Sequence, residues 1–391
     1  MTKLGVLFSV LGVGAGCIPA FAQKQLPNII VMLSDDQGWG DLGFTGNTFV
    51  QTPNIDRIAH EGTILENFYV CPVSSPTRAE FLTGRYHVRS GVNSTTGGGE
   101  RFNLGEKTIA EYFREAGYAT SLFGKWHSGT QYPYHPNARG FEEFYGFCSG
   151  HWGNYWNPVL EHNGEIISGE GFIIDDLTDK ALDYIRDHKE HPFFMFLSYN
   201  TPHSPMQVPD SWWNRVKDRT LSQRATFPEQ EDTTFTKAAL ALAENLDWNI
   251  GRVLSLLHSL DLEQETIVIY FSDNGPNSFR WNGGMKGRKG STDEGGVRSP
   301  FCIRWPGHIR KGAVETQLSG AIDLIPTLLG LAGIEYTPLR KLDGIDWGQR
   351  LLDEKAPAMD RVLYSYWGGK TSVRIPVSYT HLRAHETELH L

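Results

Sequence analysis

The chain has 391 residues, 40% of them hydrophobic, and a net charge of −9 from 45 acidic and 36 basic residues. This length allows a large buried core and exceeds that of most single compact units, so we expect a main domain with a smaller appendage. The acidic balance argues against a nucleic-acid partner and offers no broad attraction for polyanions, so any anion must be bound locally.

The N-terminus has the features of a secretory signal peptide. Lys3 supplies a positive start, residues 4–13 are mostly apolar, and Ala20-Phe-Ala22 is a small-x-small cleavage site. We therefore predict that residues 1–22 are removed and that the mature protein is exported, either periplasmic or secreted. A lipoprotein anchored at Cys17 is a second alternative, although the usual Leu three residues earlier is missing. No other stretch approaches the ~20 apolar residues of a membrane helix.

The first predicted strand ends in two carboxylates. Residues 27–34 form an apolar run rich in β-branched side chains, which is typical of a strand buried on both faces, and Asp35 and Asp36 follow it. The carboxyl ends of such strands are where α/β sheets place their ligands. Residues 52–62 then have a cap, a proline at the first helical position and a terminal glycine, which predicts a short helix.

The next segment, Ser74-Ser-Pro-Thr-Arg78, places a small hydroxyl residue ahead of a proline that can open a helix. Arg78 follows one turn later. Ser74 would project from the helix N-terminus, where backbone N–H groups favour an anion. This position is suited to a sulfate or a phosphate.

A second helix and strand follow. Thr108 and Glu111 form a capping box, and the helix closes at Gly117. Residues 118–123 return as a strand, whose end carries Gly124-Lys-Trp-His127. The chain from 131 to 170 is loop-like and aromatic; we expect it either to line a sugar-binding cleft or to form a lid packed on the core.

Strands and helices continue to alternate in the second half. We predict a helix over 175–188, a strand over 192–198 that leads to His203, an irregular polar stretch over 205–235, and a long helix over 237–260. The strand over 266–272 ends in Asp273 and Asn274, and Lys289 lies in the glycine-rich loop after it. This alternation predicts an α/β fold with a mostly parallel central sheet flanked by helices.

The chain beyond residue 335 differs in character. Residues 336–376 read as the start of a small, incomplete C-terminal subdomain, with a strand over 361–367. Residues 377–391 show no strand alternation and resemble translated adaptor sequence, so we predict an artefactual tail. The catalytic domain is accordingly expected over 23–335. Cleavage after Ala22 would leave Cys71, Cys148 and Cys302, an odd set without a CxxC pair, so neither a disulfide framework nor a thiolate metal site is predicted.

Several predicted strand ends deliver polar residues to one edge of the sheet. Together with Leu82-Thr-Gly-Arg85 after the Ser74 segment, their order and contexts resemble the type I sulfatase family over about residues 27–335. The resemblance implies an alkaline-phosphatase-like sandwich. It also implies that Ser74 is oxidised to formylglycine, whose hydrate is the nucleophile, by a radical-SAM maturase acting before export.

The resemblance also implies a metal site formed by Asp35, Asp36, Ser74, Asp273 and Asn274. Three carboxylates and an amide oxygen suit Ca²⁺ or Mg²⁺ and not zinc.

The catalytic residues implied by the family are Ser74, Arg78, Lys125, His127, His203 and Lys289. Arg78 and the two lysines would share the charge that develops on sulfate. His203 and Lys289 would assist the departing alcohol, and His127 would take a proton from the hydrate. The expected reaction is hydrolysis of a sulfated glycan or oligosaccharide.

Two other functions remain open at this point. One is a phosphoesterase of the same superfamily, whose sites usually hold zinc with additional His ligands. The other is a non-catalytic glycan-binding sulfatase homologue, to which the incomplete C-terminal subdomain gives some weight.

Overall fold

A computed structural model describes residues 1–2 and 26–376 of the chain. All of the predicted signal peptide beyond its first two residues, including Cys17, lies outside the described residues, as does the predicted artefactual tail over 377–391. None of the helices in the described ranges combines the length and apolarity needed to cross a bilayer.

The core is a ten-stranded sheet with the order β11-β2-β10-β9-β1-β8-β4-β5-β6-β7. Its centre is parallel: β1 (Asn28–Ser34) lies between β8 (Phe193–Ser198) and β9 (Thr266–Ser272), and β4 (Ala119–Lys125) joins β8 to β5 (Glu143–Phe147). One flank adds β10 (Phe301–Arg304), antiparallel to β9, and then β2 (Thr63–Leu65) and β11 (Ala313–Glu315). The other flank adds β6 (Val159–His162) and β7 (Glu165–Ser168).

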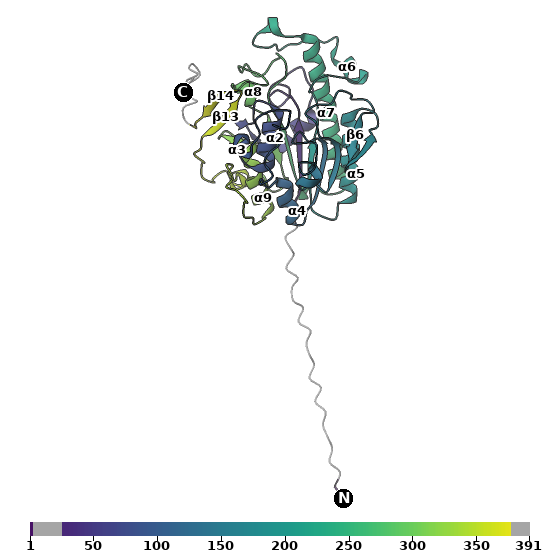
Figure 1. The fold of residues 1–391 in the computed structure, drawn as a ribbon, viewed down its shortest axis with the longest axis vertical. Helices are drawn as coiled ribbons and strands as arrows, with labels where there is room; N and C mark the ends of the chain where they lie inside the picture. Colours follow the sequence, from purple (N-terminus) through teal and green to yellow (C-terminus); the bar gives the residue numbers. More distant parts are fainter. Residues whose placement is uncertain (3–25, 377–391) are drawn as a thin grey trace.

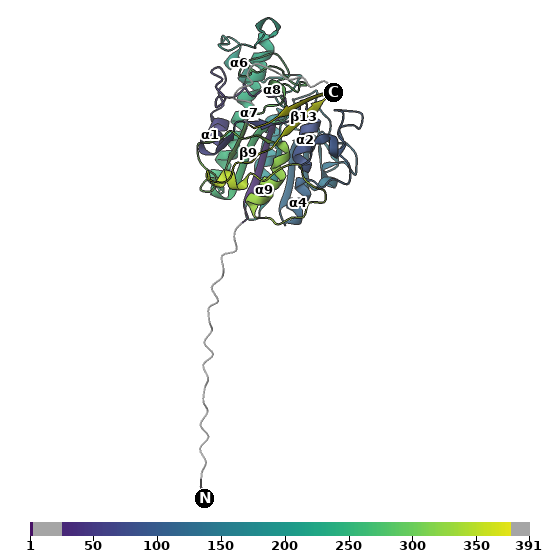
Figure 2. The ribbon, with the colours of Figure 1, turned by 90° about the vertical axis from the view of Figure 1, so that its left-hand side faces the viewer.

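Helices cover both faces of this sheet (Figures 1 and 2). One face packs against α1 (Pro53–Glu61), α5 (Ile173–Asp187) and α7 (Thr233–Ser259). The opposite face packs against α2 (Ser74–Thr83), α4 (Ile109–Glu115) and α9 (Leu324–Ala332). Alternate residues of β1 enter the two cores, which explains why the strand is apolar throughout. The predicted α/β sandwich is confirmed.

The remaining elements are short. They are β3 (Phe68–Tyr69), α3 (His87–Ser90), η1 (Pro136–Arg139), α6 (Asp210–Val216), η2 (Pro228–Gln230), η3 (Glu263–Glu265), α8 (Glu294–Val297), β12 (Ser319–Gly320), η4 (Ala321–Asp323), α10 (Gly348–Leu352), β13 (Leu363–Trp367) and β14 (Lys370–Arg374). β13 and β14 form an antiparallel hairpin at one side of the sandwich (Figure 1). The division at residue 335 stays a prediction.

Two segments predicted to be irregular contain regular structure. The aromatic stretch 131–170 is partly sheet, because β5 is a fully paired strand and β6 and β7 continue from it as a hairpin. The polar stretch 205–235 contains α6, a seven-residue helix whose Val216 is buried in a small cluster with Leu240 of α7. Both elements are too short for their periodicity to stand out, and packing against neighbours stabilises them.

Candidate active site

The carboxyl ends of β1, β4, β8 and β9 meet at one edge of the sheet, opposite the N-terminus of α2. Register fixes this arrangement: Ser34 of β1 lies beside Ser272 of β9, and Gly124 of β4 lies beside Ser198 of β8. The polar residues that follow each strand therefore come together, as the sequence predicts. Ser74 is the first residue of α2, and every residue of that helix is buried.

Arg78 connects the serine to the strand ends. Its Nε donates to Ser74 Oγ at 2.8 Å, and its Nη1 donates to the Lys125 carbonyl at 2.9 Å and to Ser198 Oγ at 2.5 Å. Its Nη2 lies 3.3 Å from Asp273 Oδ2. Because Arg78 is fully buried and already contacts four protein groups, its geometry is that of a positioning residue. The expected role of Arg78, sharing the charge that develops on sulfate, stays a prediction.

The carboxylates are held close together by backbone and side-chain contacts. The Asp36 N–H donates to Asp273 Oδ1 at 3.1 Å, and Asn274 Nδ2 donates to Asp36 Oδ1 at 2.9 Å. Ligand atoms of Asp35, Asp36 and His203 all lie within 4.8 Å of one another. Asp36 adopts a left-handed φ of 64°, a conformation that a non-glycine residue keeps only where surrounding contacts fix it.

Two lysines lie against these carboxylates. Lys125 Nζ donates to Asp35 Oδ2 at 2.6 Å, and both groups are fully buried. Burial alone would raise the pKa of Asp35, but Lys125 and His203 bring it below its ordinary value. Lys289 Nζ lies 2.7 and 2.9 Å from the two oxygens of Asp36. Burial opposes the charge of Lys289, yet Asp36 and Asp35 raise its pKa.

The site fits a hard divalent cation. Asp35 Oδ1 and Asn274 Oδ1 are buried and have no hydrogen-bond partner among the described residues, so two oxygen atoms are left for a ligand such as Ca²⁺. Burial and the nearby Asp35 raise the pKa of Asp273, which indicates crowded negative charge that a bound cation would relieve. His203 is the histidine in the cluster, which is otherwise oxygen-rich.

His127 is oriented by a loop from the other side of the site. Its Nε2 lies 2.9 Å from the Thr95 carbonyl, so this nitrogen carries the proton and Nδ1 carries the lone pair. Nδ1 is buried and has no partner within the described part of the chain. Burial, reinforced by Lys125, holds the pKa of His127 well below its usual range. The imidazole is therefore neutral and able to accept a proton at Nδ1.

His203 lies close to the carboxylates Asp35 and Asp36. Its Nδ1 donates to the Ser204 carbonyl at 2.7 Å, so Nε2 is the nitrogen that faces the site, 3.5 Å from Asp36 Oδ2. Its side chain is 18% exposed, more than those of Lys125 and Asp36. The His203 side chain is therefore partly accessible to solvent.

Sequence reasoning missed several supporting residues. Arg280 forms a buried ion pair with Asp41 and donates from Nη2 to the Asp36 carbonyl at 2.8 Å, which fixes the turn after β1. Thr77 Oγ1 donates to the Asp273 carbonyl at 2.6 Å and ties α2 to the end of β9. Thr77 belongs to the segment Ser74–Arg78, whose pattern indicates an anion site; no sequence feature indicates Arg280 or Asp41.

A glycine beside His127 provides a test of its position. A Cβ at Gly150 would lie 2.4 Å from His127 Nε2, and the buried ring has little room to move. We expect Gly150→Val to lower kcat about 10- to 100-fold, because small displacements of a catalytic group are costly. Gly153→Ala is the matched control, since a Cβ there meets nothing within 4 Å. Equal kcat values for the two variants would contradict this role for His127.

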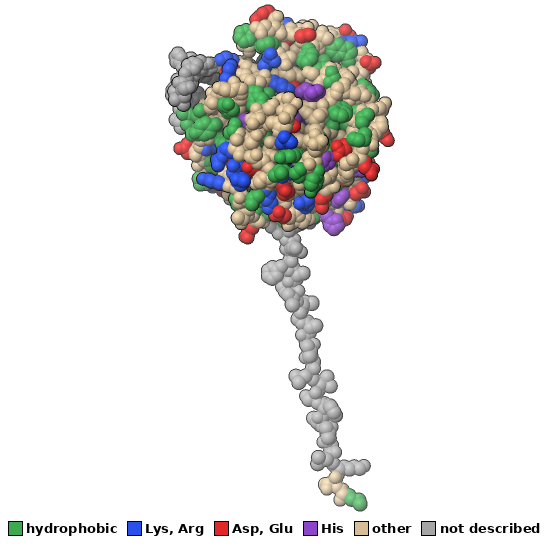
Figure 3. All heavy atoms as spheres, viewed as in Figure 1, with side chains coloured by type: hydrophobic (Ala, Val, Ile, Leu, Met, Phe, Trp, Pro, Cys, Tyr) green, Lys and Arg blue, Asp and Glu red, His purple; other side chains and the backbone are tan. Residues whose placement is uncertain are grey.

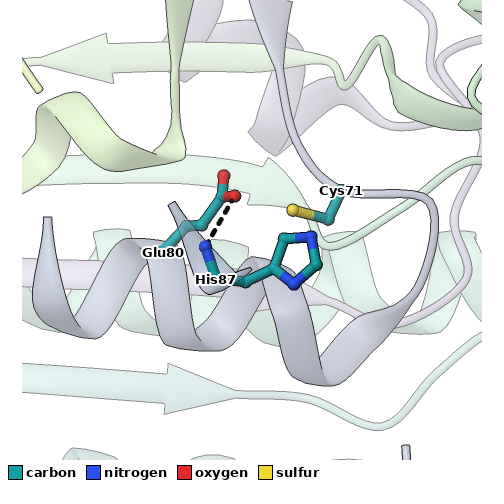
Figure 4. A group of neighbouring side chains, drawn as sticks. All are labelled: Cys71, Glu80 and His87. Carbon is teal, nitrogen blue, oxygen red and sulfur yellow. Dashed lines mark hydrogen bonds between the residues drawn. The ribbon is translucent and has the colours of Figure 1, made fainter. Parts of the chain in front are cut away.

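A second group of ionisable side chains lies near α2 (Figure 4). Cys71, Glu80 and His87 are buried and lie within 4.8 Å of one another by their ligand atoms. His87 Nδ1 lies 2.8 Å from the Val92 carbonyl, and its Nε2 lies 3.0 Å from the Tyr366 carbonyl. A carbonyl only accepts, so each ring nitrogen forms its hydrogen bond when it carries a proton, and both nitrogens face backbone oxygens. His87 instead fastens the β13–β14 hairpin to α3.

We expect His87→Ala to lower the free energy of unfolding by about 2 kcal/mol, because the buried Val92 carbonyl and the partly buried Tyr366 carbonyl lose their contacts with the ring. Urea denaturation followed by tryptophan fluorescence measures the change. Val88→Ala removes a 51% exposed neighbour and should shift the midpoint little. An unchanged midpoint for His87→Ala would show that the hairpin is held by other contacts.

The fold and the site together define a hydrolase of anionic esters with an alkaline-phosphatase-like sandwich. Comparison with known proteins agrees. The Sulfatase family model matches residues 27–334. N-acetylgalactosamine-6-sulfatase of Mus musculus is 32% identical over 402 residues, covering 94% of this chain and 72% of that protein; the Homo sapiens enzyme is also 32% identical, covering 91% and 70%.

A solved structure of Ps i-CgsB in complex with k-i-k-neocarrahexaose is similar, with a TM-score of 0.80 and 31% identity. The similarity covers 90% of this chain and 83% of that one. The chain belongs to the type I sulfatase family, and it is a sulfuric ester hydrolase.

Proposed function

We propose that this sulfatase removes sulfate from a sulfated carbohydrate, using a formylglycine formed from Ser74. The observation that carries the proposal is the position of Ser74, whose Oγ lies at the buried N-terminus of α2, 2.8 Å from Arg78 Nε. The relatives support the substrate class: one is named for N-acetylgalactosamine 6-sulfate, and another binds a neocarrahexaose. Export, with removal of residues 1–22, and a catalytic domain over 23–335 belong to the same proposal.

The sulfate group would be recognised by side chains in the site and not by the charge of the protein surface as a whole. Acidic and basic side chains are interspersed over the face drawn in Figure 3, and the net charge is −9. Lys125 and Lys289 would contact the sulfate oxygens and lower the energy of the charge that develops on them. Arg78 would keep the residue at position 74 aligned with Asp273.

Two histidines would move protons on opposite sides of the sulfur. His203 Nε2, together with Lys289, would donate to the oxygen of the departing sugar. His127 Nδ1, neutral and with no partner among the described residues, would accept a proton from the hydroxyl at position 74. Formylglycine would supply, as its hydrate, the oxygen that attacks sulfur and the second hydroxyl that allows release.

Asp35, Asp36, Asp273, Asn274 and residue 74 would hold Ca²⁺, with Mg²⁺ as the alternative ion. The bound cation would polarise a sulfate oxygen and offset the three carboxylates.

Mass spectrometry tests the modification directly. The chain, expressed with a radical-SAM maturase of the serine type, is digested with trypsin, and the peptide that ends at Arg78 is measured. We expect a mass about 2 Da below that of unmodified serine, as oxidation of an alcohol to an aldehyde requires. An unmodified peptide from protein that releases sulfate would overturn this mechanism. Binding of sulfated glycan without sulfate release from modified protein would favour a non-catalytic role.

A further inference from the structure

A polar pocket of about 300 Å³ lies beside the proposed active site. It is formed by two segments, residues 97–101 and residues 130–134. A larger cleft of about 640 Å³ lies at the first residues of β4 and β5, at the other end of these strands, and carries five carboxylates, which makes it unsuited to an anionic chain.

Both segments of the smaller pocket are anchored to the catalytic residues. Ser75, next to Ser74, donates from Oγ to the Ser94 carbonyl at 2.9 Å, and Thr95 accepts from His127. Gly97 is two residues beyond Thr95, and two residues span at most ~7 Å. The other segment begins three residues after His127, at most ~11 Å of chain. The pocket is therefore within reach of a sugar that adjoins the one carrying the scissile sulfate.

Arg101 provides unused charge in this pocket. Its Nε donates to the Gly98 carbonyl at 3.0 Å, and its guanidinium lies 4.9 Å from the centre of the Tyr134 ring. Among the described residues it forms no ion pair, so its two terminal NH₂ groups remain available for a bidentate contact with a carboxylate or a sulfate. A Cβ at Gly98 would lie 2.4 Å from Arg101 Nη2, so glycine leaves room for this fork.

An aromatic ring and a carboxylate complete the pocket. Tyr132 is 82% exposed, and an exposed ring of this kind offers an apolar face with a polar tip, which suits the face of a pyranose. Glu100 accepts from the Gly98 N–H at 2.8 Å, and its other carboxylate oxygen can accept from sugar hydroxyls.

We propose that this pocket is a subsite for a second, acidic sugar unit next to the sulfated one, with Arg101 pairing its anionic group and Tyr132 stacking on its ring. The inference rests on the proposed function and extends it: the preferred substrate is an oligosaccharide with a carboxylate or sulfate on the neighbouring unit. Arg101 is a specificity residue that takes no part in the chemical step.

Binding to the unmodified protein tests the subsite without any need for turnover. Calorimetry uses the chain with Ser74 unoxidised and two probes, a chondroitin 6-sulfate tetrasaccharide with neighbouring carboxylates and a neocarrageenan hexasaccharide with neighbouring sulfates. We expect Arg101→Ala to raise the Kd of at least one probe about tenfold. Arg114→Ala, which removes an exposed arginine on α4, is the control and should leave both Kd values within twofold.

The probe that responds identifies the anionic group as carboxylate or sulfate. Tyr132→Ala should weaken the same probe, and the thermal midpoints of the variants check folding. Kd values for Arg101→Ala within twofold of the unchanged chain would overturn the subsite, as would failure of both probes to bind. The proposed function fails separately, if the modified enzyme releases no sulfate from an aryl sulfate or a sugar sulfate.

Discussion

Replacing Ser74 with alanine is expected to lower the rate of sulfate release about 10⁵-fold, because removal of a nucleophile leaves only the contribution of the surrounding groups. The methyl group of alanine would not be converted to the aldehyde, and it has no oxygen atom that could attack the sulfur of the sulfate ester. Arg78 would lose the acceptor of its Nε, but its Nη1 and Nη2 would keep their contacts to Lys125, Ser198 and Asp273. The variant should therefore fold, which separates loss of chemistry from loss of structure.

The adjacent serine is the matched control. Ser75 is equally buried and donates a single hydrogen bond to the Ser94 carbonyl, so Ser75→Ala should reduce kcat/KM by no more than about tenfold. Both rates are measured by release of inorganic sulfate from the same substrate after expression with the maturase. Comparable losses for the two variants would mean that Ser74 acts only through packing.

Removal of divalent cations is expected to have the second largest effect. EDTA followed by desalting should reduce kcat more than about 100-fold, because the carboxylates then lack their counter-charge and sulfate loses its Lewis acid. The structural reason is the pair of buried oxygens, Asp35 Oδ1 and Asn274 Oδ1, that no described residue satisfies. Added Ca²⁺ should restore turnover, and a parallel titration with Mg²⁺ identifies the preferred ion.

A single substitution tests whether the loss of activity on cation removal comes from the carboxylate cluster. Asp36→Asn removes one negative charge while keeping a similar shape, and the Ca²⁺ concentration for half-maximal activity should rise about 10- to 100-fold. Asp56→Asn, on α1 and away from the cluster, serves as the control. Full activity of EDTA-treated protein that mass spectrometry shows to be free of metal would contradict the requirement for a divalent cation.

Much of the fold could be predicted because its central strands are continuous apolar runs. Residues 27–34, 192–198 and 266–272 match β1, β8 and β9 within one residue at each end. The strands β5, β6 and β7 at one flank of the sheet could not be predicted, because their aromatic and polar residues have the composition of a loop and pairing depends on a neighbouring strand.

The convergence of polar strand ends was also predictable, because parallel strands end at one edge. The contacts of Arg78 could not be predicted. Its four partners are residues 74, 125, 198 and 273, which only the tertiary fold brings together. The Thr95 carbonyl that orients His127 likewise lies on a loop whose path no local pattern specifies.

The complete burial of α2 has a consequence for the order of events during synthesis. Ser74 is only 2% exposed, and its hydroxyl accepts a hydrogen bond from the buried Arg78. The maturase of the proposed function would need this segment in its own catalytic centre, and the buried position of α2 in the folded protein leaves Ser74 out of its reach. Under the proposed function, oxidation would come before folding, and protein that folds with an intact serine would stay inactive when maturase is added later.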